Sequence, residues 1–479
     1  MNRRLRRALM GACSILLLWS TVACIAAPQE GARDGAAADA GPAVPGSDGD
    51  FDWERCRGET IHVMLNQHPY TEAILERLPE FEKKTGIRVR YSVTPESNYF
   101  DKLTVSLNAR NGHPDVFMTG SYQLWEFLFS GHVQELDSLI QDRGYTSPDY
   151  DVEDFFEGVL KGNRWNMKVG QPVGTGPLWA VPLGFEMNVL MYNRRALDQV
   201  GADPPKTFDE LLETASRLNG WNGGGSYGIA VRGTRSWATI HPGYMTAYSM
   251  AGAEDFSMEG GTLKSRVNSP QAVQITERFA ELVRKAGPKD WTNYTWYQVS
   301  TDLGAGKAAL AYDADNLGFF QNVEGASKEA GNIGWAPPPL PKEGARLGSN
   351  MWIWSLAMNR HSRNKEAAWL FMQYFTGKEH IRWGATEAKV VNPPRRSVWE
   401  DAKFQERIGR MEGYRETFES VIDHSTIKFT PQPEFFNITT EWAAALQDIV
   451  IGSAGAEERL NQLARDADMR IKRMMDRIE

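Results

Sequence analysis

The feature that most constrains the fold is a long apolar run at residues 178–193, LWAVPLGFEMNVLMYN, which contains one glutamate, Glu186. Proline removes a ladder donor and glycine frees the backbone, so the run predicts two short buried strands hinged at 182–186. A buried carboxylate without a partner is costly. Glu186 therefore either reaches solvent or a local partner, or it lies at the lip of a cleft where a strand crosses between two lobes.

The 479 residues could form two sizeable cores, at roughly 100–200 residues per domain. Residues 60–65 alternate as a strand, 70–85 have helical spacing, and 87–93 alternate again. Strands that alternate with helices predict βαβ units and a parallel sheet. Further strands are predicted at 114–118, 227–232, 307–313 and 351–358, and further helices at 99–108, 207–218, 270–285, 364–375, 441–451 and 457–475.

The first 23 residues, with four arginines followed by an apolar stretch, predict a secretory signal peptide. They end in Thr21-Val-Ala before Cys24, which resembles a bacterial lipobox although Thr21 replaces the usual leucine. Cys24 is therefore the predicted lipidation site, and cleavage within 23–27 is the alternative. Residues 24–57 are predicted to be a flexible tether, because 25–50 are mostly small or polar.

Charge and cysteine content exclude several classes of function. Loss of residues 1–23 removes four arginines and no acid, so the formal net charge of −8 becomes −12. An acidic protein is a poor partner for nucleic acid, whose phosphates must be neutralised. Cys56 would be left without a disulfide partner unless Cys24 stays unlipidated. The eight histidines show no tight ligand spacing, so no metal or cofactor is expected.

Two short motifs have a structural explanation. The G-x-S-x-G match at 224–228 precedes a predicted strand instead of a helix, so it predicts a turn and not a serine hydrolase elbow. The GAGK sequence at 304–307 lacks the first glycine and the final Ser/Thr of a phosphate loop. Asp313 and Asp315 could be proposed as glycosidase acids, although nothing in the sequence sets their separation.

Four segments carry a family resemblance: GHPDVF at 112–117, 180–194 together with 205–211, GKAAL at 306–310 and NKEAAWLF at 364–371. In their order and spacing they resemble the extracellular solute-binding proteins of bacterial carbohydrate ABC transporters, the family that includes maltose-binding protein. The segments 227–233, 313–315 and 351–357 look closest to the sugar and sugar-alcohol binders of that family.

The resemblance implies an α/β fold with two discontinuous lobes joined by three crossing strands. The crossings are expected at 182–187, 353–357 and 390–394. Lobe 1 would comprise 58–184 plus 356–391, and lobe 2 would comprise 187–353 plus 393–479.

The resemblance also implies an interlobe cleft that binds a sugar or polyol. Such a ligand has apolar C–H faces and many hydroxyls, so its site needs aromatic rings together with charged and amide side chains. The expected ligand-binding residues are Gln67, His68, Ser121, Tyr122, Glu186, Trp237, His241, Asp313, Asp315, Asn350, Trp352 and Arg395.

The function implied is non-enzymatic capture of a carbohydrate or polyol and its delivery to the permease subunits of an ABC importer. We expect a monomer without cofactor or metal, tethered at the outer face of the cytoplasmic membrane or free in the periplasm. One alternative is an exported glycoside hydrolase that uses Glu186 with Asp313 or Asp315. Another keeps the fold and changes the ligand to a phosphodiester, a peptide or a metal.

Overall fold

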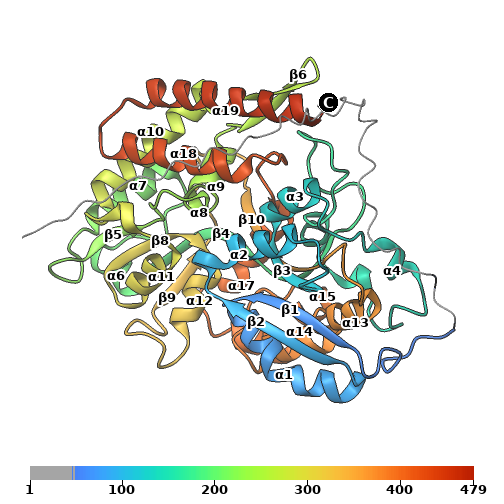
Figure 1. Cartoon of the computed structure of the whole chain (residues 1–479). Helices are drawn as coiled ribbons and strands as arrows, with labels where there is room; N and C mark the ends of the chain where they lie inside the picture. The colour runs from blue at the N-terminus through green and yellow to red at the C-terminus, as the bar shows by residue number, and fades with distance from the viewer. Residues whose placement is uncertain (1–45, 47–48, 479) are drawn as a thin grey trace, which may run out of the picture. The chain divides into compact units, whose positions relative to one another are not determined.

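The computed structural model describes residue 46 and residues 49–478, whose helices and strands are labelled in Figure 1. The predicted signal peptide, the lipidation residue Cys24 and residues 25–45 of the predicted tether lie outside the described residues. Within the described part of the chain, no helix is both long and apolar enough to cross a membrane.

Residues 51–57, which the sequence assigns to the end of the tether, pack on the folded body. The Phe51 ring meets Trp53 edge to face, with ring centroids 5.0 Å apart, and Trp53 contacts Tyr374 at 5.9 Å. Cys56 is buried in the main hydrophobic core. The packed body therefore begins several residues before the predicted end of the tether.

One nine-stranded sheet has the order β2-β1-β3-β10-β4-β8-β5, with β11 paired to β10 and β9 to β4. The pairs β1–β2, β1–β3 and β5–β8 are parallel. The pairs β3–β10, β10–β4 and β4–β8 are antiparallel. The sheet is mixed, because β4 and β10 lie outside the βαβ units. The strands are β1 (Thr60–Asn66), β2 (Arg88–Thr94), β3 (Val116–Gly120), β4 (Ala180–Asn193), β5 (Tyr227–Ala230), β8 (Ala308–Ala314), β9 (Ile333–Ala336), β10 (Ser349–Met358), β11 (Ser425–Thr426) and the separate hairpin β6 (Phe256–Glu259) and β7 (Thr262–Ser265).

β4 corrects the prediction of two hinged strands, because it is one continuous strand of 14 residues that is buried throughout. Its register with β10 shifts between Pro182 and Gly184, so Leu183 is the extra residue of a β-bulge. The bulge accommodates the proline without ending the strand. Gly184 is required because a Cβ there would come within 2.2 Å of the Tyr70 hydroxyl.

β4 and β10 connect two groups of strands. Residues 354–358 of β10 pair with β3, and residues 188–193 of β4 pair with β8 and β9. The predicted lobe boundary at 184–187 falls in β4 just before its pairing with β8, and the boundary at 353–356 falls in β10 where its pairing with β3 begins. The division of the chain into those lobes stays a prediction.

The third predicted crossing, residues 390–394, is an irregular segment and not a strand. Pro393 and Pro394 lack the N–H groups that a ladder needs, and Asn392 has a φ of 53°, in the left-handed region. The Asn392 amide donates to the Phe185 carbonyl in β4 at 3.1 Å. A side-chain bond thus replaces sheet pairing at this crossing.

The long helices confirm the periodicity, with ends that shift by a few residues, whereas the sequence did not indicate most of the short ones. Short helices depend on tertiary packing more than on their own propensity, which explains the omission. The helices are α1 (Pro69–Thr85), α2 (Glu96–Asn108), α3 (Ser121–Phe129), α4 (Asp137–Gln141), α5 (Glu157–Lys161), α6 (Arg194–Val200), α7 (Phe208–Arg217), α8 (Trp237–Ile240), α9 (Gly243–Met250), α10 (Pro270–Ala286), α11 (Trp296–Gly304), α12 (Asn316–Asn322), α13 (Lys365–Phe375), α14 (Lys378–Thr386), α15 (Arg396–Trp399), α16 (Ala402–Ile408), α17 (Tyr414–Val421), α18 (Phe435–Val450) and α19 (Ala456–Ile478).

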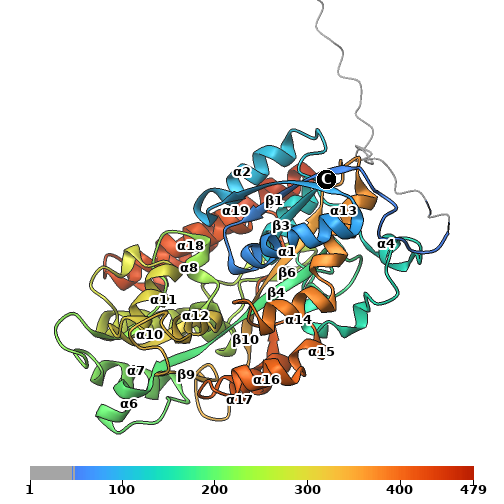
Figure 2. The same cartoon turned by 90° about the horizontal axis from the view of Figure 1, so that it is seen from below.

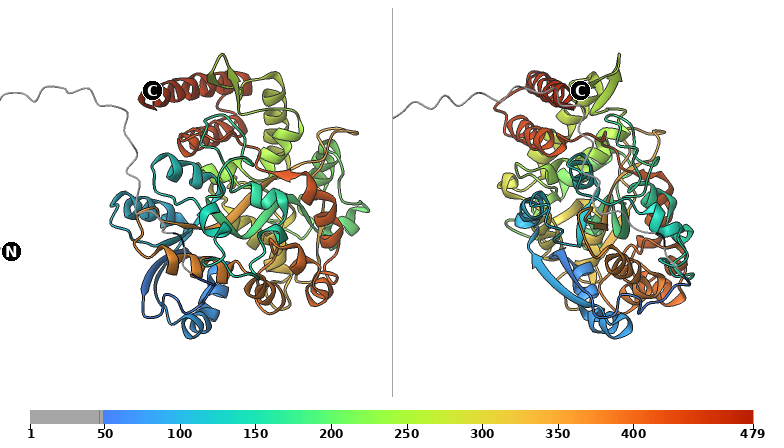
Figure 3. Two further views of the ribbon diagram at one scale, coloured as in Figure 1. Left: turned by 90° about the vertical axis from the view of Figure 1, so that its right-hand side faces the viewer. Right: turned by 45° about the vertical axis from the view of Figure 1, so that its right-hand side comes forward.

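The C-terminal helices α18 and α19 pack on α10 and on the β6–β7 hairpin, as Figures 1 and 3 show. A second apolar cluster joins Phe256 and Leu263 of the hairpin to Ile438 of α18 and Ile471 of α19. In the other direction along the sheet, α13 packs against α1, α14 and β1 (Figure 2).

Candidate ligand-binding site

One cavity combines four indole rings, two imidazoles, two carboxylates, a guanidinium and an amide. It contains about 380 Å³ of space not filled by protein atoms, open solvent at its mouth included. The structure brings five of the predicted site residues together here: His68, Glu186, Trp237, His241 and Trp352. The other lining residues are Glu96, Arg232, Trp296, Asn316, Leu317, Phe320 and Trp354.

Glu186 lies in β4 with its side chain toward this cavity. Its Oε1 accepts hydrogen bonds from Asn316 Nδ2 at 3.1 Å and from Trp354 Nε1 at 3.2 Å. Within the described residues, this leaves Oε2 for a ligand hydroxyl. Burial raises the pKa of Glu186 from its usual 4.5 to about 7, so the carboxyl can be protonated or ionised near neutral pH.

Arg232 follows β5 and supplies the positive charge of the cavity. Its Nε lies 2.9 Å from Asp313 Oδ2, and its Nη2 lies 2.6 Å from Oδ1. Burial acts to lower the pKa of Arg232, but the attraction of Asp313 and the neighbouring glutamates leaves it above its usual value. Asp313, predicted to contact the ligand, instead holds the guanidinium in place from β8.

The two imidazoles of the cavity are neutral. Burial lowers the pKa of His68 to about 3, and burial together with Arg232 lowers the pKa of His241 well below its usual value. His241 Nε2 lies 3.0 Å from Arg232 Nη1. A neutral imidazole has one donor and one acceptor nitrogen, so His241 can accept from Arg232 and donate from Nδ1.

Two buried polar atoms of the cavity lack a hydrogen-bond partner among the described residues: His241 Nδ1 and Asn316 Oδ1. Both side chains are at least 98% buried. A buried polar group left unpaired costs about 1–3 kcal/mol. His241 Nδ1 can donate to a ligand hydroxyl, and Asn316 Oδ1 can accept from one.

Indole rings form the apolar part of the cavity. Trp237 stacks on Trp352 with ring centroids 5.1 Å apart and an interplanar angle of 27°, and Trp354 meets Trp352 edge to face. Gly120 makes the packing possible, because a Cβ at this position would come within 2.0 Å of the Trp352 ring. The rings suit the C–H faces of a sugar or polyol.

The first residues of α2 and α11 meet at one side of the cavity, where Trp296 Nε1 donates to Glu96 Oε2 at 3.1 Å. Both residues also line an outer hollow of about 1,010 Å³, open solvent included, which is lined as well by the rings of Phe100 and Tyr297. The contact between Glu96 and Trp296 therefore forms part of the wall between the cavity and the outer hollow.

Other predicted residues lie behind the indole wall. Tyr122 packs on Trp352 with ring centroids 5.0 Å apart, and its hydroxyl accepts from Asn350 Nδ2 at 2.9 Å. Ser121 Oγ accepts from the Ile353 backbone N–H at 3.2 Å. These side chains position β10 and its tryptophans, and they do not line the cavity.

Three predicted residues are placed elsewhere. Asp315 accepts from Asn392 Nδ2 at 2.8 Å and joins β8 to the irregular crossing. Gln67 is exposed after β1. Arg395 is fully buried and donates from Nε to the Thr376 carbonyl at 2.7 Å. The structure does not bring these residues to the cavity.

The sequence did not single out Glu96, Arg232 or Trp296 as site residues. Glu96 follows β2 and Arg232 follows β5, so both lie at the carboxyl ends of parallel strands, where ligands bind in open α/β sheets. That rule could have indicated both residues. Trp296 begins a short helix after a loop, a position that the rule does not mark as a binding site.

The fold and the cavity define a class, namely two-lobed α/β proteins that enclose a small polar ligand among aromatic rings. The chain belongs to the bacterial extracellular solute-binding proteins, whose family model matches residues 67–380. The resemblance drawn from the sequence and the predicted fold class are thereby confirmed.

Two characterised relatives and two solved structures are similar over most of the chain. The erythritol/L-threitol-binding protein of Mycolicibacterium smegmatis is 42% identical over 418 residues, 87% of each chain. The mannitol-binding protein of Pseudomonas aeruginosa is 24% identical over 82% of this chain and 88% of its own. An Agrobacterium vitis solute-binding protein with bound D-mannitol superposes with a TM-score of 0.71 at 22% identity, over 88% of this chain and 99% of its own. Maltose-bound MalE3 of T. maritima gives a TM-score of 0.73 at 20% identity, over 87% and 100%.

Proposed function

We propose that this chain is the receptor of an ABC importer and that its ligand is a small sugar alcohol. The observation that carries this proposal is the cavity, which combines stacked indoles with Glu186, Arg232 and the unpaired atoms of His241 and Asn316. The relative at 42% identity is named for erythritol and L-threitol, which supports the same ligand class.

The wall of the cavity supports a short ligand. Trp296 Nε1 donates to Glu96 Oε2 at 3.1 Å, and this contact separates the cavity from the outer hollow. A linear polyol therefore fits the cavity better than an oligosaccharide does.

We infer that the chain binds its ligand without transforming it. The hydrolase alternative pairs Glu186 with Asp313 or Asp315. Asp313 is held by Arg232, and Asp315 is held by Asn392. Both aspartates are at least 98% buried and neither lines the cavity, which removes the partners that this alternative requires.

Delivery to the permease follows from the family as a further part of the proposal. A ligand can shift an equilibrium between open and closed forms only by its differential affinity for the two. Glu96 follows β2 in predicted lobe 1, and Trp296 lies in predicted lobe 2. A closed, ligand-bound form held in part by this contact would dock on the permease subunits.

We also propose that Cys24 carries a lipid and holds the receptor at the outer face of the cytoplasmic membrane. The lipobox-like residues 21–24 support this proposal. Labelling of cells with a fatty-acid analogue should mark the wild-type chain and not Cys24→Ala. Equal labelling of both would contradict the anchor.

Isothermal titration of the purified chain against erythritol, threitol, ribitol, mannitol, maltose, several amino acids and a phosphodiester tests the ligand class. We expect saturable binding of a tetritol or another short polyol, recovery of the ligand unchanged, and an increase in Tm through mass action. Binding confined to amino acids or phosphodiesters, or release of a chemically altered product, would overturn the proposal.

A further inference from the structure

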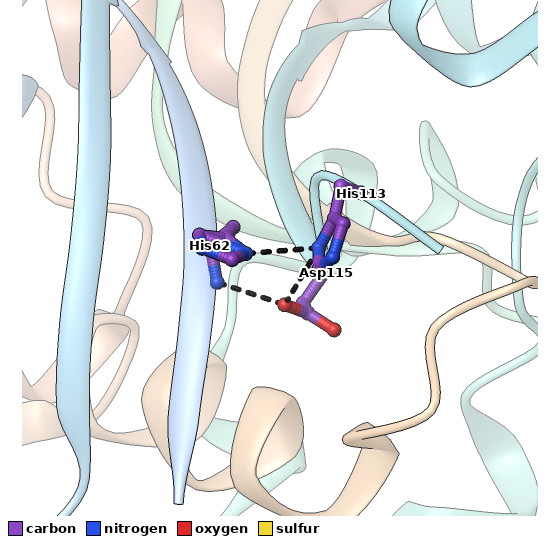
Figure 4. A group of neighbouring side chains, drawn as sticks. All are labelled: His62, His113 and Asp115. Atoms are coloured by element: carbon purple, nitrogen blue, oxygen red, sulfur yellow. Dashed lines mark hydrogen bonds and ion pairs between the residues drawn. The ribbon is translucent and has the colours of Figure 1, made fainter. Parts of the chain in front are cut away.

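A second cluster of polar side chains lies outside the ligand cavity (Figure 4). His62 belongs to β1, and His113 and Asp115 lie on the segment that leads into β3, which pairs with β1. The sequence showed no tight histidine spacing because His62 is separated from the other two by about fifty positions. Strand pairing brings the three residues together, and nothing in the proposed polyol site uses them.

The ligand-type atoms of the three side chains converge. His62 Nδ1 and His113 Nδ1 are 2.9 Å apart, and His113 Nδ1 is 3.8 Å from Asp115 Oδ2. One nitrogen or oxygen from each residue lies within 4.8 Å of the others. In Figure 4 the two imidazole rings lie beside the carboxylate, and they meet edge to face with ring centroids 4.2 Å apart.

These separations suit a small transition-metal ion. Zinc binds imidazole nitrogen and carboxylate oxygen at about 2.0–2.2 Å, and tetrahedral geometry then puts two ligand atoms roughly 3.3 Å apart. The observed 2.9 Å and 3.8 Å lie on either side of this value. The side chain of His113 is 52% exposed, so its ring can make the small adjustment required.

The carboxylate is already held in position. Asp115 Oδ1 accepts from Ser362 Oγ at 2.5 Å and from Asn364 Nδ2 at 3.1 Å, and Oδ2 accepts from the His62 backbone N–H at 2.8 Å. A carboxylate oxygen has two lone pairs, so Oδ2 can still bind a cation. Hydrogen bonds of this kind orient a metal ligand and commonly change metal affinity by about 10–100-fold.

The cluster opens to solvent through a surface hollow lined by His62, His113, Arg90 and Lys102. The positive charges of Arg90 and Lys102 disfavour the binding of a cation at the cluster. Arg90 is exposed, and Lys102 lies near Thr94 Oγ1 at 3.4 Å. Solvent screens charges on long exposed side chains, so they weaken cation binding without preventing it.

We propose that His62, His113 and Asp115 form a binding site for a divalent transition-metal ion, for which zinc is the best match, with solvent completing its coordination. Bound metal would tie β1 to the segment before β3. The competing arrangement is a metal-free hydrogen bond between the two imidazoles.

Zinc titration of the purified full chain against a chromophoric chelator tests the site. We expect one zinc equivalent to be lost, or weakened more than about tenfold, in His62→Ala and in His113→Ala. His424→Ala is the matched control, because it removes an exposed histidine distant in sequence from the cluster. The cysteines are the same in all four proteins, so zinc bound to thiols cancels in the comparison.

Two further readouts keep the test decisive. Zinc should raise the Tm of the wild type and of His424→Ala but not that of His113→Ala. It should also shift the ring-nitrogen NMR signals of His62 and His113. Equal zinc affinity in all four proteins, or unshifted signals at saturating zinc, would assign the cluster to a hydrogen bond and overturn the proposal.

Discussion

Two groups of histidine and aspartate side chains in this molecule have similar residues and different partners. In the ligand cavity, Arg232 Nη2 lies 2.6 Å from Asp313 Oδ1, and Nη1 reaches His241. Beside β1, Asp115 takes its bonds from a backbone N–H, a hydroxyl and an amide. The first group contains a permanent cation, whereas the second directs its imidazole nitrogens at each other.

The difference shows what each group can bind. The guanidinium of Arg232 is paired with Asp313, and neighbouring polar atoms of the cavity are left to pair with the hydroxyls of an uncharged ligand. The cluster around His62 has an oriented carboxylate and two imidazoles, which suits an exchangeable cation.

Arg232→Ala should abolish polyol binding. It removes the central cation and leaves Asp313 as a buried, uncompensated charge, which typically costs about 3–5 kcal/mol of stability. Calorimetry should show polyol affinity reduced more than about 100-fold. Arg232→Lys keeps a positive charge beside Asp313, so it is the variant expected to stay folded if Arg232→Ala does not. The matched control is Arg235→Ala, whose side chain is 61% exposed. Polyol binding equal to wild type in Arg232→Ala would contradict the role of Arg232.

Glu186→Gln should weaken polyol binding by roughly 10–100-fold, because a hydrogen bond to a charged group contributes about 1.5–3 kcal/mol. The amide keeps the shape of the side chain and can still accept from Asn316 and Trp354. Titration of the ligand that binds the wild type most tightly measures the change. Unchanged affinity would place the ligand elsewhere.

The same variant tests the raised pKa of Glu186. Its unfolded value is near 4.5 and its folded value is about 7. The stability that this group contributes is therefore complete below pH 4.5 and is lost as the pH rises through 7. Denaturant unfolding of the ligand-free proteins should show Glu186→Gln gaining roughly 1–3 kcal/mol relative to wild type between pH 4.5 and 8. A difference that does not vary with pH would contradict the raised value.

Trp296→Ala should have a smaller effect on the best polyol, a loss of about 2–10-fold, since one ring contact is worth roughly 0.5–1.5 kcal/mol. The variant should gain affinity for a disaccharide alditol, because the wall between the cavity and the outer hollow is opened. Glu96→Gln keeps the bulk of this wall and is the control. The same ligand range in Trp296→Ala and in wild type would show that the wall does not select by length.

His113→Ala should leave polyol affinity within about twofold of the wild type, because sites without shared partners act independently. It should lose the zinc effect described above. A parallel loss of polyol affinity would mean that the two groups of side chains are energetically coupled.

Much of the fold could be predicted from residue periodicity. The pattern of α1, β2 and α10 is local, since it depends on residues within one turn or one strand. The bulge at Leu183 and the irregular crossing at 390–394 depend on partners distant in the sequence. Local pattern cannot reveal such pairing.

The site residues also differ in whether they could be predicted from the sequence. Glu186 stood out because a carboxylate interrupts an apolar run, and the family resemblance placed Trp237 and Trp352 at the site. The resemblance also placed Asp313 among the ligand contacts, because its ion pair with Arg232, which follows β5, is not visible in the sequence. The same reason concealed the cluster of His62 and His113.

The most direct test of the account is a crystal structure of the chain with the short polyol that binds most tightly. Ligand hydroxyls should lie within hydrogen-bonding distance of Glu186 Oε2, His241 Nδ1 and Asn316 Oδ1, with the carbon chain against Trp352. A ligand bound in the outer hollow, or anywhere that leaves His241 Nδ1 and Asn316 Oδ1 unpaired, would contradict it.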